Sequence, residues 1–196
     1  MICRRETKRA LGVLVRTESC SVDRLVVERE FKEGIMSGFV RNLVALIIAL
    51  AAPLVIGGLS SISTISSIPT WYRGLSKPPW NPPDWAFGPA WTALYILMGV
   101  ASWLVWRYGW DNRSVRVALR VFAVQLLLNG IWSVLFFGLR SPGIALVEIG
   151  VLWCMILATV VLFARRDLLA GAILVPYLLW VTFASALNWE VWSLNR

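Results

Sequence analysis

Long apolar runs separated by short charged segments dominate the chain after residue 35. A helix needs about 20 apolar residues to cross the roughly 30 Å hydrocarbon core of a bilayer, and each run is about that long. The runs do not alternate apolar and polar positions as barrel strands do, and a helix satisfies its own backbone in lipid. The pattern therefore predicts an all-α integral membrane protein, a bundle of five transmembrane helices. The predicted spans lie near residues 39–60, 85–106, 117–138, 142–164 and 168–190.

The segment 61–84 joins the first two predicted spans and is the longest connection. It begins rich in serine and continues as WYRGLSKPPWNPPDW over residues 71–85. Proline fixes φ and restricts the residue before it, so this loop is stiff without being helical, and Asp84 is placed to cap the second helix. The loop could cover the helix ends as a lid. An interfacial aromatic belt is the alternative, and composition alone favours the belt.

Charge and composition support a membrane location. Hydrophobic residues make up 58% of the chain and charged residues 15%, which disfavours soluble and disordered classes. The basic residues fall mostly between the apolar runs instead of along a soluble face, so nucleic-acid binding is not expected. Without residues 1–35, seven basic residues fall on the side of Arg41 and four on the other. The positive-inside rule then predicts a cytoplasmic N-terminus, and we expect a multi-pass protein of a bacterial cell membrane.

Residues 1–35 differ from the rest of the chain. They contain eight basic and six acidic residues and no apolar run long enough for a secretory signal, and the acids argue against a mitochondrial transit peptide. We expect Met36 to be the start of the protein, with 1–35 a mis-assigned leader and 36–196 the membrane domain. A cytoplasmic tail with a short amphipathic helix is the alternative.

The sequence offers few groups for conventional catalysis or metal binding. It has no histidine, and Cys3, Cys20 and Cys154 form no CxxC motif, so we expect no metal site, no disulfide framework and no histidine-based catalytic set. An enzyme is therefore not expected. Glu148 is the only acid well inside a predicted span, which makes it a functional candidate, with structural pairing as the alternative.

Three predicted helices carry mixed aromatic and polar stripes, because residues three or four apart share a helix face. Buried amides in lipid are costly unless paired, so the stripes should face the interior of the bundle. There they could form a pocket for a flat apolar ligand or simply pack, and the residues alone favour packing. The stripes are Phe87, Trp91, Tyr95 and Met98; Gln125, Asn129, Trp132 and Phe136; and Tyr177, Trp180, Ala184 and Asn188.

Several different short motifs follow one another between residues 40 and 192. They are Trp71-Tyr72 with Leu75, Lys77-Pro78, Trp80 to Pro83, Trp85, Trp91-Thr92, Leu94-Tyr95, Met98, Gln125, Leu128-Asn129, Trp132-Ser133, Phe136 to Gly138, Pro176 to Leu178, Trp180, Phe183-Ala184 and Leu187-Asn188. In order and spacing the chain resembles the TspO/MBR family of tryptophan-rich sensory and translocator proteins.

This resemblance implies a five-helix bundle, often a homodimer, that binds porphyrins and related tetrapyrroles in a pocket opening under the first loop. It places Trp91, Asn129 and Trp180 at ligand-contact positions. The chain is thus expected to be a membrane receptor or sensor that binds a tetrapyrrole such as protoporphyrin IX and regulates or moves it. Light-dependent porphyrin degradation and small-molecule transport are the alternatives.

A porphyrin would use specific groups of this chain. Indole rings can stack on its face, and its two carboxylates need cations, for which Arg73 and Lys77, beside Trp80 in the loop, are available. Haem usually takes an axial histidine, which the chain lacks. The sulfurs of Cys154, Met98 and Met155 are weak substitutes, so a metal-free porphyrin is the better expectation, with no obligatory cofactor.

The sequence departs from the family pattern at two places, so two family properties, sterol binding and the usual dimer contact, are not expected of this chain. The tail from Leu187 to Trp192 lacks the tyrosine of the sterol motif found in mammalian members, so sterol binding is not expected. The third span lacks a Gly-xxx-Gly pair near residues 120–124, so a homodimer would use another face or would not form.

Overall fold

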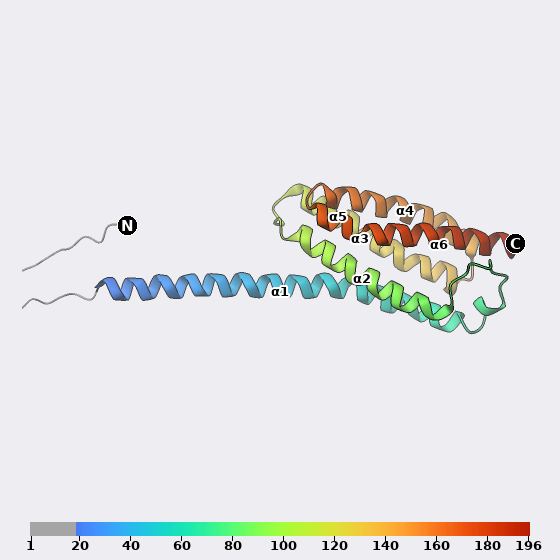
Figure 1. Ribbon diagram of the computed structural model, residues 1–196, viewed down its shortest axis with the longest axis horizontal. Helices are drawn as coiled ribbons and strands as arrows, with labels where there is room; N and C mark the ends of the chain where they lie inside the picture. Colours follow the sequence, from blue (N-terminus) through green and yellow to red (C-terminus); the bar gives the residue numbers. More distant parts are fainter. Residues whose placement is uncertain (1–18) are drawn as a thin grey trace, which may run out of the picture. The chain divides into compact units, whose positions relative to one another are not determined.

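Helices make up most of the described residues in the computed structural model (Figure 1). It describes the backbone from Ser19 and the side chains from Met36 to Arg196. Two compact units divide the chain, residues 1–44 and residues 45–196. Most of 1–35 lies outside what is described, so the expectations for that segment stay predictions.

Five helical segments of the described residues are long and apolar enough to cross a membrane, which confirms the predicted class. Within this part of the chain there is no strand. The spans are Met36–Ser67 in α1 (Ser19–Ser67), α2 (Asp84–Trp106), α3 (Arg113–Ser133) continued to Gly138, α4 (Pro142–Ala164), and Leu168–Leu194, which comprises α5 (Leu168–Ile173) and α6 (Val175–Leu194).

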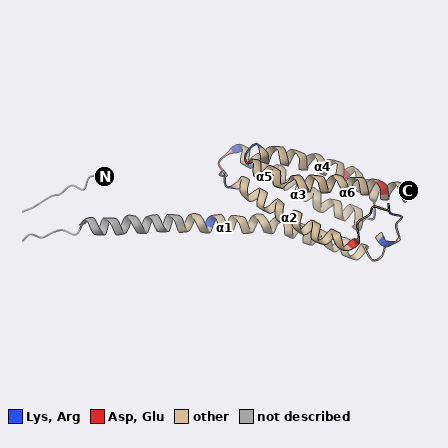
Figure 2. Ribbon diagram, viewed as in Figure 1, with Lys and Arg blue, Asp and Glu red and all other residues tan. Residues whose placement is uncertain are grey.

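Within the unit 45–196, α4 packs against α3 and α6, and the short α5 packs against α2 and α4. The central core contains Met98, Ile156 and Phe163, which are fully buried. Large apolar side chains such as Val147 and Leu179 are exposed on the outside, where lipid would cover them. Charged residues lie mostly at the ends of these helices, as Figure 2 shows.

The first span ends later than predicted, so the serine-rich start of the expected 61–84 loop is helical. Helix α1 continues to Ser67, and the connection is residues 68–83. The hydroxyls of Ser60 and Ser61 donate to the carbonyls of Ile56 and Gly58, at 2.6 and 2.7 Å. Because these serines satisfy their polar groups inside the helix, they do not end it.

Asp84 does not cap α2, contrary to the prediction. Pro83 holds the N-cap position with φ −61° and ψ 142°, and Asp84 is the first helical residue with no side-chain capping bond. The backbone N–H of Ala86 donates to the Pro83 carbonyl at 2.9 Å, so the proline's fixed backbone starts the helix. The Asp84 carboxylate still lies at the positive end of the helix dipole.

Two prolines inside predicted spans behave differently. Pro53 lies within α1 without ending it. The fifth span is interrupted at Leu174, immediately before Val175 and Pro176 start α6. A proline has no N–H to donate to the preceding turn, which accounts for the break between α5 and α6.

Candidate functional site

The loop 68–83 is anchored through Tyr72, which is 3% exposed. Its hydroxyl donates to Asn81 Oδ1 at 2.9 Å, and its ring meets those of Phe136 and Phe137 edge-on at 6.2 and 5.6 Å. Burial, with a smaller contribution from the Asp84 charge, raises the pKa of the Tyr72 phenol from 10.0 to about 12. The loop is therefore folded over an aromatic cluster at the ends of the helices.

The same loop is also tied to α6. The backbone N–H of Ser76 donates to Asn195 Oδ1 at 3.0 Å, and Asn195 Nδ2 donates back to the Ser76 carbonyl at 2.9 Å. The Trp80 ring lies 5.7 Å from that of Phe183. Lys77 Nζ lies 4.5 Å from the centre of the Tyr72 ring, so this cation is already engaged by an aromatic face.

A cavity of about 500 Å³ lies beneath this loop. Its walls come from α1, α2, the end of α3 and α6. Trp91 stacks on Tyr95 with centroids 5.6 Å apart and meets Trp180 edge-on at 6.4 Å. The sequence-predicted residues that line it are Phe87, Trp91, Tyr95, Trp132, Phe136, Trp180, Ala184 and Asn188.

A π-helical turn, Val134–Gly138, shapes the wall at the end of α3. The N–H of Leu139 donates to the Val134 carbonyl at 2.8 Å, five residues back, and Ser67 Oγ donates to the Phe137 carbonyl at 2.7 Å. The extra residue in the turn places Phe136 against the cavity, where its ring stacks on Trp132 at 5.2 Å. Such turns are often found at functional sites.

The α1 wall was not predicted. It contains two glycines and three hydroxyl residues, Gly57, Gly58, Ser60, Ser61 and Thr64. A Cβ on Gly57 would lie 2.6 Å from two carbons of the Tyr95 ring, so this glycine lets the ring lie directly against α1. The signal in the sequence is a cluster of small residues in an apolar run, which is typical of close helix contacts in membranes.

The floor of the cavity is a buried hydrogen-bond network between α2, α3 and α6. Tyr95 donates to Asn129 Oδ1 at 2.8 Å, and Asn129 Nδ2 donates to the Tyr177 hydroxyl at 3.1 Å. Tyr177 in turn donates to Gln125 Oε1 at 2.9 Å. Gln125 and Asn129 are 1% and 2% exposed and lie behind Tyr95, outside the cavity lining.

A second set of hydrogen bonds joins the helices of the wall nearer to the loop 68–83. Trp132 Nε1 donates to Asn188 Oδ1 at 3.1 Å, and Asn188 Nδ2 donates to the Pro142 carbonyl at 2.8 Å. Asn188 is therefore held by α3 on one side and by the start of α4 on the other.

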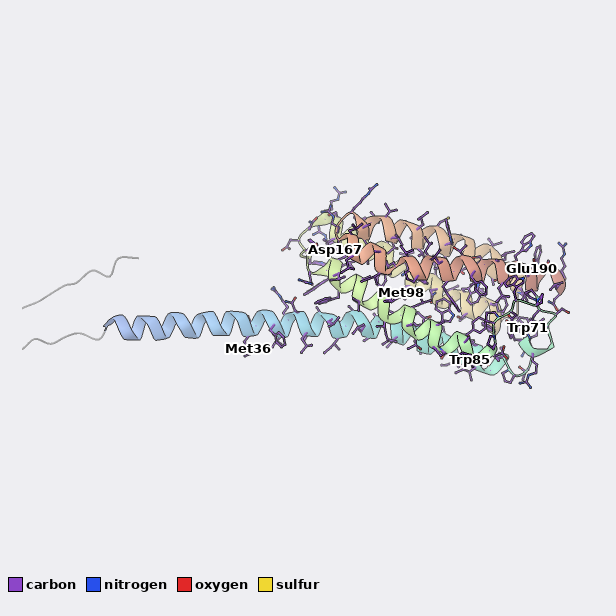
Figure 3. All side chains as sticks on the ribbon, in the orientation of Figure 1. Met36, Trp71, Trp85, Met98, Asp167 and Glu190 are labelled. Atoms are coloured by element: carbon purple, nitrogen blue, oxygen red, sulfur yellow. The ribbon has the colours of Figure 1, made fainter. Side chains whose placement is uncertain are left out.

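The predicted carboxylate contacts Arg73, Lys77 and Trp80 lie in the loop and do not line the cavity. Among the described lining residues, Asp84 is the only charged one. Several lining residues of α1 and α2 are also exposed on the outer surface, including Gly58, Gly88 and Trp85, the last 75% exposed. The cavity therefore opens between these two helices. In Figure 3, Trp71 and Trp85 lie toward the loop end, Met98 nearer the middle and Asp167 at the opposite end.

Glu148 lies on α4 and does not line the cavity. Both of its carboxylate oxygens are inaccessible to solvent and have no hydrogen-bond partner in the described part of the chain. Cys154 is exposed on α4, Met98 is fully buried, and neither they nor Met155 line the cavity. No group of three metal-ligating residues occurs among the residues that the structure describes.

Comparison with known proteins gives consistent matches. The sequence pattern of the TspO/MBR family matches residues 49–193. The Tryptophan-rich protein TspO of Chlorobaculum tepidum is 43% identical over 155 residues, which cover 79% of this chain and 98% of that protein. The Tryptophan-rich sensory protein of Cereibacter sphaeroides is 42% identical over 64% of this chain and 77% of its own length. The human Translocator protein is 42% identical over 64% of this chain and 75% of its own length.

Proposed function

The chain belongs to the TspO/MBR family of membrane sensory and translocator proteins, and we propose that it is a receptor or sensor that binds porphyrin-type tetrapyrroles in the aromatic cavity. Its relatives are named as sensory and translocator proteins, and none of the names quoted above is that of an enzyme. The proposed role is recognition of the tetrapyrrole, with regulation or movement of the ligand as its outcome.

One observation carries this proposal, the cavity with four indole rings in its wall, those of Trp85, Trp91, Trp132 and Trp180. Its volume of about 500 Å³ falls within the range of about 300–1,000 Å³ that small-molecule pockets occupy. The rings of Trp91, Trp132 and Trp180 offer faces and edges to a flat aromatic ligand. Hydroxyl and amide groups at Ser60 and Asn188 supply a few polar contacts.

The charges of the site suggest how such a ligand lies. No cation lines the cavity among the described residues, and Asp84 would repel a carboxylate at the mouth. We therefore propose that the macrocycle enters the cavity while its carboxylates stay outside. Water solvates the carboxylates there, and because Arg73 in the loop is exposed, any pairing with it is screened by solvent and adds little to the affinity.

Trp180 gives a clean test of this proposal. Its indole N–H is buried and has no hydrogen-bond partner in the described part of the chain. The substitution Trp180→Phe therefore removes ring area without breaking a hydrogen bond of the unliganded protein. A loss of ligand affinity in this variant would report on contacts with the ligand.

The experiment is a dark titration of the detergent-solubilised full chain with protoporphyrin IX, followed by tryptophan quenching. Trp91→Phe and Trp180→Phe should each weaken binding about five-fold, as expected for the loss of roughly 1 kcal/mol of aromatic contact. Trp110→Phe is the matched control, because Trp110 lies in the α2–α3 loop outside the cavity lining. Equal affinities for all four proteins, or quenching that only follows detergent partitioning, would refute the proposal.

The orientation of the carboxylates is tested with the dimethyl ester of protoporphyrin IX. The ester should bind at least as tightly as the acid, and Asp84→Asn should improve binding of the acid while leaving the ester unchanged. Weaker binding of the ester in the wild-type chain would show that the carboxylates are held by the protein, contrary to the proposed pose.

Movement of the ligand is a second candidate function, favoured by the opening of the cavity between α1 and α2. Accumulation of protoporphyrin IX inside vesicles that contain the protein would support it, and equal accumulation in vesicles without protein would exclude it. Illumination of the same complex, with porphyrin absorbance as the readout, tests the alternative of light-dependent degradation.

A further inference from the structure

A group of arginines lies at the end of the bundle opposite the 68–83 loop. The residues are Arg107, Arg113, Arg116 and Arg120 around the α2–α3 loop, and Arg165 and Arg166 between α4 and α5. Figure 2 shows these cations at one end of the 45–196 unit. We call this group, with the aromatic residues of the α2–α3 loop, the basic surface.

The two loops that form the basic surface are in direct contact. The Tyr108 hydroxyl, next to Arg107, donates to Asp167 Oδ2, next to Arg166, at 3.4 Å. Helix α5, which begins after Asp167, also packs against α2. The arginines of the two loops therefore belong to one surface.

Most of these guanidinium groups make no hydrogen bond or ion pair with the described residues. Arg116 donates to the carbonyls of Trp110 and Asp111 at 2.9 and 2.8 Å and so shapes the loop. The other five arginines are exposed, and within the described residues none forms an ion pair with a carboxylate. Asp167 Oδ1 is occupied as the N-cap of α5, accepting from two backbone N–H groups. Asp111 and Asp167 lie in the same two loops, so the six arginines leave the surface with a net charge of +4 (six minus two).

Aromatic residues place the basic surface at the depth of lipid headgroups. Tyr108 and Trp110 are 52% and 53% exposed in the loop that follows the second span. Tyrosine and tryptophan prefer the interface between hydrocarbon and water. The Arg107 guanidinium lies 4.9 Å from the centre of the Trp103 ring. This interfacial preference would bring the cations to the depth of the lipid phosphates.

We propose that the basic surface binds the phosphate groups of anionic phospholipids. All six cations there are arginines, although a lysine would serve equally well if net charge for orientation were the only requirement. The planar guanidinium donates two parallel hydrogen bonds to a phosphate, which an ammonium group does not. The interfacial depth of the surface favours a lipid phosphate over a soluble one.

The test uses the purified full chain in neutral detergent, with phosphatidylglycerol and phosphatidylcholine of the same acyl chains as probes. Retained lipid is measured after exchange by native mass spectrometry. The wild-type chain should retain phosphatidylglycerol preferentially, and Arg165→Gln/Arg166→Gln should reduce this preference by about five-fold for each arginine removed. Arg73→Gln/Arg140→Gln, which removes two exposed cations at the other end, should leave it unchanged.

A charge-conserving variant, Arg165→Lys/Arg166→Lys, separates the guanidinium geometry from charge and serves if the glutamine variant does not fold. It should lose part of the preference. Equal retention of the two lipids, equal losses in both glutamine double variants, or displacement of phosphatidylglycerol by millimolar inorganic phosphate would each overturn the proposal. The last result would indicate a site for a free anion.

Discussion

The substitution Gly57→Ala tests how closely α1 packs against the ring of Tyr95 in the wall of the cavity. A Cβ at this position would lie 2.6 Å from Cδ2 and Cζ of Tyr95 and closer still to Cε2. Carbon atoms in contact are normally about 3.5–4.0 Å apart. The ring of Tyr95 or the backbone of α1 must therefore move by about 1 Å or more to accept one methyl group.

Tyr95 has little freedom to move away. Its ring is stacked on Trp91, and its hydroxyl donates to Asn129 at 2.8 Å. Overpacking of this kind costs about 1–3 kcal/mol. Loss of the bond to Asn129 would add about 0.6–2 kcal/mol in a membrane bundle, whereas alanine in a helix recovers up to about 1 kcal/mol relative to glycine. We expect a net destabilisation of about 1–3 kcal/mol.

The assay is the thermal unfolding of the full chain in detergent, with protoporphyrin IX titration as a second readout. Gly58→Ala is the matched control, because Gly58 also lines the cavity but a Cβ there would meet no atom within 4 Å. Gly57→Ala should lower Tm by several degrees and weaken ligand binding by up to about ten-fold. Gly58→Ala should leave Tm unchanged or slightly raised.

A double-mutant cycle isolates the contact. If the overlap with Tyr95 is the cause, Gly57→Ala should cost almost nothing in a Tyr95→Ala background, because the ring is absent. An undiminished cost in that background, or identical behaviour of the two glycine variants, would refute the reasoning.

Three further predictions concern the loop and α4. Burial raises the pKa of the Tyr72 phenol from 10.0 to about 12, so the stability that the neutral phenol contributes is complete below pH 10 and is lost as the pH rises toward 12. In an absorbance titration at 295 nm, Tyr72→Phe should remove one tyrosine that ionises at high pH. Asn195→Ala removes the acceptor of the Ser76 N–H, so hydrogen exchange at that amide should accelerate at least ten-fold, and an unchanged rate would contradict the anchoring of the loop. Glu148→Gln removes the charge of a buried carboxylate that has no hydrogen-bond partner among the described residues, and it should stabilise the chain by about 1–3 kcal/mol. The measurement is Tm, with Glu190→Gln near the end of α6 as the control, because Glu190 is only partly buried.

The spans were predictable from sequence because lipid imposes a strict requirement on length and apolar content. Their ends were less predictable, because serines satisfy their hydroxyls inside the helix by bonding to preceding carbonyls, as at Ser60 and Ser61. The π-helical turn at Val134–Gly138 has no periodic signature that a short sequence would reveal.

The positions of the charged groups around the cavity could not be predicted from the sequence, because they depend on the fold. Counting the cations of the loop suggested Lys77 as a carboxylate contact, but its ammonium lies over the Tyr72 ring. Asp84 was interpreted as a helix cap, whereas it lines the mouth of the cavity. The sequence shows which charged groups are present, but what each of them faces is decided by how the 68–83 loop folds over the helices.

Helical periodicity identified the inward faces but not the depth at which the cavity ends. Along α2 the lining continues from Phe87 to Tyr95 and stops before Met98, which is fully buried. In α3 and α6 the deeper residues, Asn129 and Tyr177, come earlier in the chain and form the network with Tyr95. Because α2 runs from the loop end and the other two helices run toward it, the three stripes meet at one level. Hydrogen bonds close the floor there, which explains why one stripe contains both cavity-lining and core residues.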